Sequence, residues 1–338
     1  MSVKWRRRAA PTSCRKGAHA TGTRMSESGC ITDVPGIRLG HAHSDAGHTG
    51  CSVVLLERGA VAGVDIGGSA PGTRETEMLN PTNMVVRMHA LLFTGGSTFG
   101  LAAASGVQHY LVEHDIGFHA STGVVVPIVP TACIFDLDVG RPRIYPDHQM
   151  GLRACEAATA EASPQGAVGV GVGARCGKVL GSDFAMRGGL GTASARLPGG
   201  VVVGALAVCN AWGDVIDPET GAIVAGARRP DGAGFLDTDA WLSTQERLEA
   251  RYFGMDTTLC VVATNARFSR EQVTKIAMMA QDGVARATRP SHTLFDGDVV
   301  FALSCGEVEG DLTIVGAMAA RLVSAAIVRG VRSASGRS

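Results

Sequence analysis

A short run of β-branched and apolar residues, Thr257 to Ala263, most constrains what this chain can fold into. It follows a polar segment, Asp237 to Tyr252, and its composition is typical of a strand that is buried on both faces. Thr257 stands where the two segments meet. A hydroxyl at the start of a core strand is ordinary, and in most proteins such a threonine only ends a ladder of hydrogen bonds. The alternative is chemical, because cleavage of the preceding peptide bond would give Thr257 a free α-amine beside its hydroxyl.

The composition indicates a globular protein with a large core. Of its 338 residues, 45% are hydrophobic and 18% are charged, enough for one large domain or two small ones. Glycine is frequent, at 45 residues, and aromatic residues make up only 5%. We therefore expect closely packed layers with many tight turns, and little surface on which nucleic-acid bases could stack.

The first residues differ from the rest in charge. Residues 1–24 contain seven Lys and Arg and no acid, which leaves 24 basic against 31 acidic residues in the remainder. No apolar segment follows these arginines, so a secretory signal is disfavoured, and no later run approaches the length of a membrane span. We expect a cytoplasmic protein with a disordered basic leader over residues 1–30, or a true start at Met25. A targeting or nucleic-acid arm is the alternative.

The cysteines and histidines give no recognised metal-binding pattern. The nine cysteines include no C-x-x-C pair, and five of them lie in apolar stretches, so we expect reduced core residues. His41, His43 and His48 cluster in the sequence but fit no ligand spacing. We predict surface histidines and no metal.

The hydrophobic pattern predicts an α/β protein. Cys51–Leu56 and Val61–Ile66 read as a hairpin around Glu57-Arg58-Gly59. Further strands are expected at Ala90–Phe93, Val201–Val208 and Thr293–Leu303, and helices up to about His114, from Asp147 to about Ala162, after a Ser269–Gln272 capping box, and over Leu312–Val331.

Two glycine-rich stretches fail as known motifs. Gly95-Gly96-Ser97 precedes a helix, but Phe99 occupies the last position of the G-x-S-x-G nucleophile elbow. Gly169–Ala174 is not followed by an amphipathic helix, which excludes a dinucleotide-binding fingerprint.

Four polar residues near apolar runs could support chemistry at Thr257. The candidates are Lys178, Asn210, Asp296 and Asp298. A threonine hydroxyl is too weakly acidic to attack an amide unaided, whereas a free α-amine with a pKa of about 7.7–8.0 can accept its proton. An asparagine can donate to an oxyanion, a lysine favours developing negative charge, and two close aspartates would titrate together with one pKa raised. Each residue also has a plain structural interpretation, and spacing alone does not decide between the two.

Several long motifs, in order, resemble the L-aminopeptidase/D-esterase (DmpA-type) family of autoprocessed N-terminal-nucleophile hydrolases. They are Ile31–His41, Gly68–Thr76, Thr94–Ala104, and Thr257-Thr258 with the following strand. The resemblance covers residues 31 to 331 and implies a four-layer α/β/β/α sandwich whose cleaved halves stay intertwined and form homo-oligomers, usually tetramers. Asp256-Thr257-Thr258 and Phe295–Asp298 look most similar to the nylon-oligomer hydrolases within it.

The resemblance also implies roles for residues. Thr257 would be the nucleophile for self-cleavage and for hydrolysis, Asn210 the oxyanion-hole residue and Lys178 the active-site lysine. Tyr145 would line the pocket. Asp296 and Asp298 would position the nucleophile, and no cofactor would be needed. One position departs from the family, because Asp256 stands where nylon-type precursors have Asn and the aminopeptidases Gly, which puts the rate of maturation in doubt.

We therefore expect one hydrolase domain over residues 31–338 that cleaves itself into residues 1–256 and 257–338. The first expectation for its substrate is a 6-aminohexanoate oligomer or similar oligoamide cut internally, because of the aspartate pair. The second is the N-terminal residue of a small peptide, amide or ester, released by an aminopeptidase or β-peptidase. An unprocessed scaffold and an acyl transfer to an amine are the remaining alternatives.

Overall fold

A nine-stranded sheet forms the centre of the computed structural model, which describes residues 29–140, 144–248 and 256–336. The basic leader lies almost wholly outside these residues. The strands are, in spatial order, β10 (Gly189–Arg196), β11 (Val202–Asn210), β14 (Thr257–Ala266), β16 (Val299–Val308), β2 (Thr49–Ile66), β4 (Arg87–Thr94), β7 (Thr131–Cys133) and β3 (Thr73–Arg74), with β1 (Arg38–Ser44) paired to β2.

Strand β2 corrects the predicted hairpin. Its 18 residues are continuous, and its first part pairs with β1 and β4 whereas Val61–Ile66 pairs with β16. The exposed Glu57 and Arg58 therefore mark an irregularity rather than a turn, since the register with β4 shifts between Leu55 and Ala60. The apolar runs on both sides of the irregularity find different partners, which local sequence cannot indicate.

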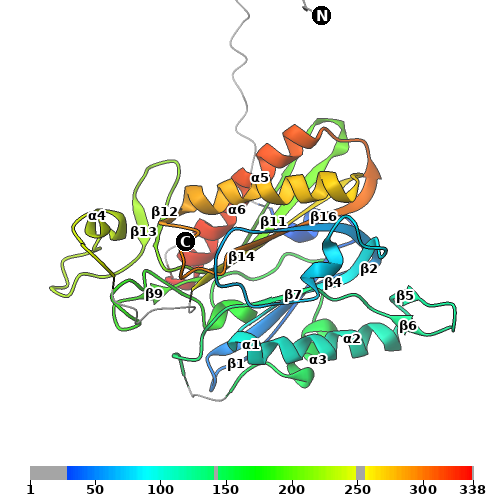
Figure 1. The fold of residues 1–338 in the computed structure, drawn as a ribbon, viewed down its shortest axis with the longest axis horizontal. Coiled ribbons are helices and arrows are strands. Elements are labelled where there is room, and N and C mark those ends of the chain that lie inside the picture. The colour runs from blue at the N-terminus through cyan, green and yellow to red at the C-terminus, as the bar shows by residue number, and fades with distance from the viewer. Residues whose placement is uncertain (1–28, 141–143, 249–255, 337–338) are drawn as a thin grey trace, which may run out of the picture.

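Successive side chains along each strand point to opposite faces of the sheet, and they divide the interior into three hydrophobic cores between four layers. In β14, Val262 packs towards α5 (Arg270–Ala287) and α6 (Leu312–Ala334), whereas Val261 enters a core between the two halves of the sheet. In β2, Val54 joins that same inner core, whereas Val53 packs with α2 (Ala104–Glu113) and α3 (His148–Glu156). Helices therefore cover both outer faces (Figure 1). The expected four-layer α/β/β/α sandwich is confirmed.

The remaining elements are short. They are α1 (Ser97–Gly100), α4 (Thr238–Leu242), β5 (Phe118–His119), β6 (Val125–Val126), β8 (Arg175–Cys176), β9 (Met186–Arg187), β12 (Asp214–Ile216), β13 (Ile223–Ala225), β15 (Thr288–Arg289), and 3₁₀ turns at Ile31–Asp33, Thr76–Leu79, Leu101–Ala103, Gly169–Val172 and Pro198–Gly200.

Two predicted boundaries were wrong. Asp147 does cap α3, but the helix ends at Glu156, because Thr159 exchanges backbone hydrogen bonds with Leu39 at 2.9 and 3.1 Å and is drawn into an extended conformation. Strand β16 begins at Val299 rather than at position 293. The aspartates at 296 and 298 therefore lie in the loop that leads into the strand.

The expectation that no run approaches the length of a membrane span was wrong for α6, the one described helix that is long and apolar enough to cross a membrane. In the structure, 67% of its apolar window is buried in the protein. It packs on α5, β10 and β11. One close approach is between Gly330 of α6 and β10. A Cβ at Gly330 would lie 2.6 Å from the Gly191 nitrogen and 2.7 Å from the Leu190 carbonyl carbon.

This approach predicts that Gly330→Ala destabilises the protein. Alanine normally favours a helix over glycine, but here its methyl group meets backbone that cannot rotate away, so the free energy of unfolding should fall by about 1–3 kcal/mol. Urea unfolding measures it, with the exposed Ser333→Ala in the same helix as the control. An unchanged or raised stability of Gly330→Ala would contradict this packing.

Candidate active site

The sheet brings Thr257 beside Asn210. These residues face each other at the start of β14 and the end of the antiparallel β11. Because β14 and β16 are parallel, the loop that enters β16 lies at the same edge as Thr257. Asp256 forms a bridge with Asp296 there. Strand pairing, rather than nearness in sequence, thus assembles this edge.

The hydroxyl of Thr257 lies against the peptide bond that precedes it. Its Oγ1 donates a short hydrogen bond to the carbonyl oxygen of Asp256. The backbone N–H of Gly297 donates to the same oxygen at 2.8 Å. A Cβ at Gly297 would come within 2.9 Å of Thr257 Oγ1, so this close approach requires glycine. Hydroxyl, carbonyl and an N–H donor therefore meet at one peptide bond.

Lys178 reaches the side chain of Asp256 from a loop after β8. Its Nζ lies 2.8 Å from Asp256 Oδ1, and both side chains are buried. Burial raises the pKa of the Asp256 carboxyl, and the charge of Lys178 opposes that rise. The backbone of Lys178 is fixed by its N–H, which donates to Trp212 O at 2.9 Å.

Asp298 holds the beginning of β14. One of its carboxylate oxygens accepts from the backbone N–H of Thr258 at 2.6 Å. The other accepts from the backbone N–H of His292 and lies 2.9 Å from Nδ1 of the same residue. The hydrogen bond to Asp298 raises the pKa of His292. His292 had not been identified from the sequence. Its position six residues before Asp298 in a polar loop was the only signal.

Asp296 is held by its own turn. Its Oδ2 accepts from the backbone N–H and hydroxyl of Thr293, at 3.0 and 2.6 Å, and its Oδ1 accepts from the backbone N–H of Trp212 at 3.3 Å. Burial, with the charge of Asp298, raises the pKa of Asp296. Because Asp296 bonds within a turn rather than to a neighbouring strand, it lies in the loop before β16, which begins at Val299.

Two hydrogen bonds of the Asn210 side chain lead to groups other than the Asp256 carbonyl. Its Nδ2 donates to Phe135 O at 3.2 Å, and its Oδ1 accepts from Arg175 N–H at 3.0 Å. The predicted oxyanion role of Asn210 remains a prediction. The backbone donor to the Asp256 carbonyl is Gly297 N–H, which sequence reasoning missed because a backbone group carries no residue signature.

Within the described residues, no ring contact or hydrogen bond links Tyr145 to Thr257, Lys178 or the two aspartates. Its ring, with 39% of the residue exposed, stacks on Phe99 with centroids 5.2 Å apart. Its predicted place in the substrate pocket is therefore untested.

Among the described residues, no three or more His, Cys, Asp or Glu side chains lie close enough together to hold a metal ion. His43 and His48 are exposed as expected. His41 is not, because its ring bonds Ser52 and Ser163 at 2.8 Å each, and burial lowers its pKa to about 4. The eight described cysteines are unpaired, as predicted.

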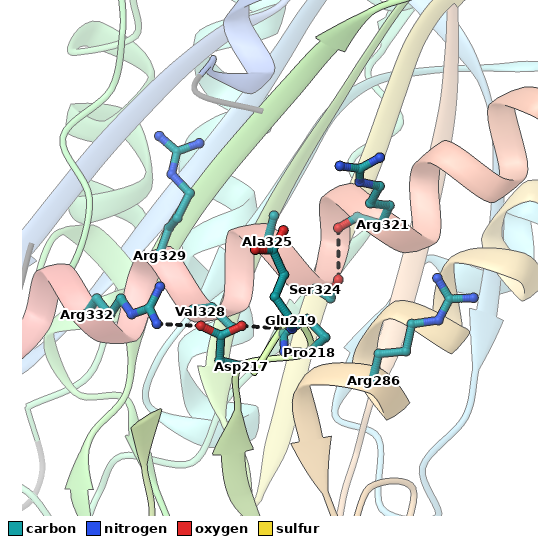
Figure 2. A pocket seen from close by; sticks show the side chains of 10 residues that line it. All are labelled: Asp217, Pro218, Glu219, Arg286, Arg321, Ser324, Ala325, Val328, Arg329 and Arg332. Atoms are coloured by element: carbon teal, nitrogen blue, oxygen red, sulfur yellow. Dashed lines mark hydrogen bonds and ion pairs between the residues drawn. The ribbon is translucent and has the colours of Figure 1, made fainter. Parts of the chain in front are cut away.

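A cavity of about 590 Å³ between α5, α6 and the turn after β12 lies apart from these residues. Figure 2 shows Arg286, Arg321, Arg329 and Arg332 around it, with Asp217 paired to Arg332 at 2.6 Å. None of the candidate catalytic residues lines it.

Sequence comparison places the chain among known hydrolases. The profile of peptidase family S58 matches residues 29–337. An uncharacterized aminopeptidase of Mycobacterium bovis is 45% identical over 90% of this chain and 94% of its own length. A 6-aminohexanoate-oligomer endohydrolase of Paenarthrobacter ureafaciens is 31% identical over 82% of this chain and 75% of its own length. The aminopeptidase is thus the nearer of these two relatives, contrary to the expected order.

Solved structures agree on the fold. The L-aminopeptidase D-Ala-esterase/amidase of Ochrobactrum anthropi, described as a variant of the Ntn-hydrolase fold, superposes with a TM-score of 0.68 at 17% identity, over 92% of this chain and 87% of that one. A Burkholderia β-aminopeptidase gives a TM-score of 0.65 at 22% identity, over 91% and 88% of the two chains. The chain has this Ntn-hydrolase fold and is an amide-bond hydrolase that belongs to peptidase family S58.

Proposed function

We propose that this protein is an aminopeptidase that matures by cleaving its own chain between Asp256 and Thr257. The observation that carries the proposal is the position of the Thr257 hydroxyl and the Gly297 N–H on the carbonyl oxygen of Asp256. Maturation would give pieces of residues 1–256 and 257–338. An unprocessed scaffold would have no need of this arrangement.

Self-cleavage would proceed by an acyl shift. Thr257 Oγ1 forms a bond to the carbonyl carbon of Asp256, the C–N bond breaks, and the hydroxyl proton goes to the departing amine. The N–H of Gly297 stabilises the negative charge that develops on the carbonyl oxygen. Water then hydrolyses the ester, which releases the Asp256 carboxylate and restores the hydroxyl.

The mature enzyme would repeat these steps on its substrate. The new α-amine of Thr257, with a pKa of about 7.7–8.0 before the environment acts on it, takes the hydroxyl proton and later passes it to the leaving amine. Asp298 fixes the adjoining backbone through Thr258 N–H. The buried Lys178 favours the unprotonated amine by charge repulsion.

The substrate proposal rests on the relatives. The 45% identical relative is named an aminopeptidase, and it supports release of N-terminal residues from small peptides or amides. Internal hydrolysis of 6-aminohexanoate oligomers is the second candidate. It is supported by the 31% identical endohydrolase and by the two aspartates, Asp296 and Asp298, in the loop before β16.

We further propose that the mature protein is a cytoplasmic homotetramer of cleaved pairs that needs no metal or organic cofactor. Support comes from the family resemblance and from the site, where backbone and side-chain groups supply nucleophile, proton acceptor and oxyanion donor.

Thr257→Ala should remain a single chain and lose amidase activity by more than about a thousandfold, because both reactions lose their attacking oxygen. Thr257→Ser keeps a hydroxyl and should still yield two pieces. Denaturing gels and intact mass measure both. Cleavage of the alanine variant at position 256 would place the nucleophile elsewhere.

Wild-type enzyme should hydrolyse amino-acid p-nitroanilides with a kcat/KM at least about tenfold above that for linear 6-aminohexanoate oligomers, if the aminopeptidase proposal holds. The two assays are run in parallel on the same cleaved preparation. Turnover confined to the oligomers would reverse the order of the two candidates.

The pairing of His292 with Asp298 predicts a pH dependence of stability. Folding raises the pKa of His292, so the pair stabilises the protein below the unfolded value of about 6.5, and this contribution is lost as the pH rises through the folded pKa. In an uncleaved Thr257→Ala background, His292→Asn should lose less free energy of unfolding than its parent between about pH 5.5 and about pH 9. Equal losses in urea titrations would show that the pair does not titrate in this way.

A further inference from the structure

A small apolar pocket shares its walls with the candidate active site. Its volume is about 240 Å³, below the about 300–1,000 Å³ of pockets that enclose a whole ligand, so it has the size for one side chain. Its apolar lining includes Val179, Leu180, Trp212, Trp241 and Phe295. The rings of Trp212 and Phe295 have their centroids 5.1 Å apart. Among the described residues that line it, Arg247 alone is charged, and it is exposed. We call this space the Trp212 pocket.

Two walls of the Trp212 pocket adjoin residues that contact Asp256. Val179 follows Lys178, whose Nζ lies 2.8 Å from Asp256 Oδ1. Phe295 precedes Asp296, which forms a backbone bridge with Asp256. Consecutive Cα atoms are about 3.8 Å apart, so each wall residue lies one step along the chain from a residue that contacts Asp256. The pocket therefore lies beside residue 256, which is on the acyl side of the proposed cleavage.

Trp212 joins these two walls. Its carbonyl oxygen accepts from the backbone N–H of Lys178 at 2.9 Å, and its own backbone N–H donates to Asp296 Oδ1 at 3.3 Å. The residue is 2% exposed, and its buried indole N–H has no hydrogen-bond partner among the described residues. A buried donor without an acceptor is unfavourable, which distinguishes this pocket from an ordinary packing gap. An aromatic ring that enters the pocket can accept this N–H through its face or through a phenol oxygen.

We propose that the Trp212 pocket receives the side chain of the substrate's acyl residue, so that the mature enzyme releases large aromatic N-terminal residues in preference to alanine. This inference rests on the proposed function, because it requires an acyl-Thr257 ester whose acyl residue takes the place of residue 256. A ring in the pocket exchanges water for apolar and aromatic contacts, whereas a methyl group is too short to fill it. The charge of Arg247 disfavours a basic side chain there.

The first test measures kcat/KM for phenylalanyl and alanyl p-nitroanilide with cleaved wild-type enzyme. The two substrates differ in one phenyl ring alone, and we expect the phenylalanyl compound to exceed the alanyl compound at least about tenfold. Leu180→Trp fills the pocket with a larger side chain, and Trp241→Ala removes one of its walls. Each variant should lower this ratio at least about threefold, whatever its overall activity. Leu294→Ala removes an exposed apolar side chain that does not line the pocket, and as the control it should leave the ratio unchanged.

The second test does not depend on turnover. Two of the three tryptophans of the chain, Trp212 and Trp241, line the pocket, so an aromatic ligand inside it should change the tryptophan fluorescence. Phenylalaninol and alaninol are the probes, because they lack the carbonyl group and cannot be hydrolysed. We expect phenylalaninol to bind cleaved wild-type enzyme at least about tenfold more tightly than alaninol.

Equal or better turnover of the alanyl anilide by cleaved wild-type enzyme would overturn the inference and leave the proposed function in place. A ratio unchanged in both Leu180→Trp and Trp241→Ala would also overturn it, as would a fluorescence that phenylalaninol does not alter. A wild-type chain that stays intact in the gel would instead remove the proposed function, and the inference with it.

Discussion

The parallel pairing of β14 with β16 is the constraint on which the rest of this structure depends. Parallel neighbours begin at the same edge of a sheet, so Thr257 at the start of β14 and the loop before β16 must meet. The connection between them runs through α5, which covers the outer face of the same strands. One structural unit thus supplies a layer of the core and places the two aspartates beside the start of β14, where Thr257 lies.

The edge of the sheet at Thr257 holds buried charged side chains in pairs, and each charge would destabilise the protein without its partner. Lys178 faces Asp256, and Asp298 faces His292 and the start of β14. Breaking a buried pair leaves an uncompensated charge and is strongly destabilising. The proposed cleavage after Asp256 would disturb such a pair, because it would remove the chain connection that holds the carboxylate against the lysine.

The sequence predicted the parts of the fold that local pattern determines. The buried strand after Thr257 and the capped helix that follows it appear as β14 and α5, because periodicity and a capping box are properties of neighbouring residues. The continuous β2 could not be foreseen, since its two halves are defined by partners far away in the chain. The same limit applies to the site. Thr257, Lys178 and Asp298 came from family motifs, whereas His292 and the Gly297 N–H became visible only through contacts.

The most direct test of this account is the amino terminus of the smaller piece in catalytically active protein. N-terminal sequencing together with intact mass should find a piece of 82 residues that begins with Thr257. Active protein that consists only of the undivided chain of 34.8 kDa, or whose new terminus lies at another residue, would contradict the account.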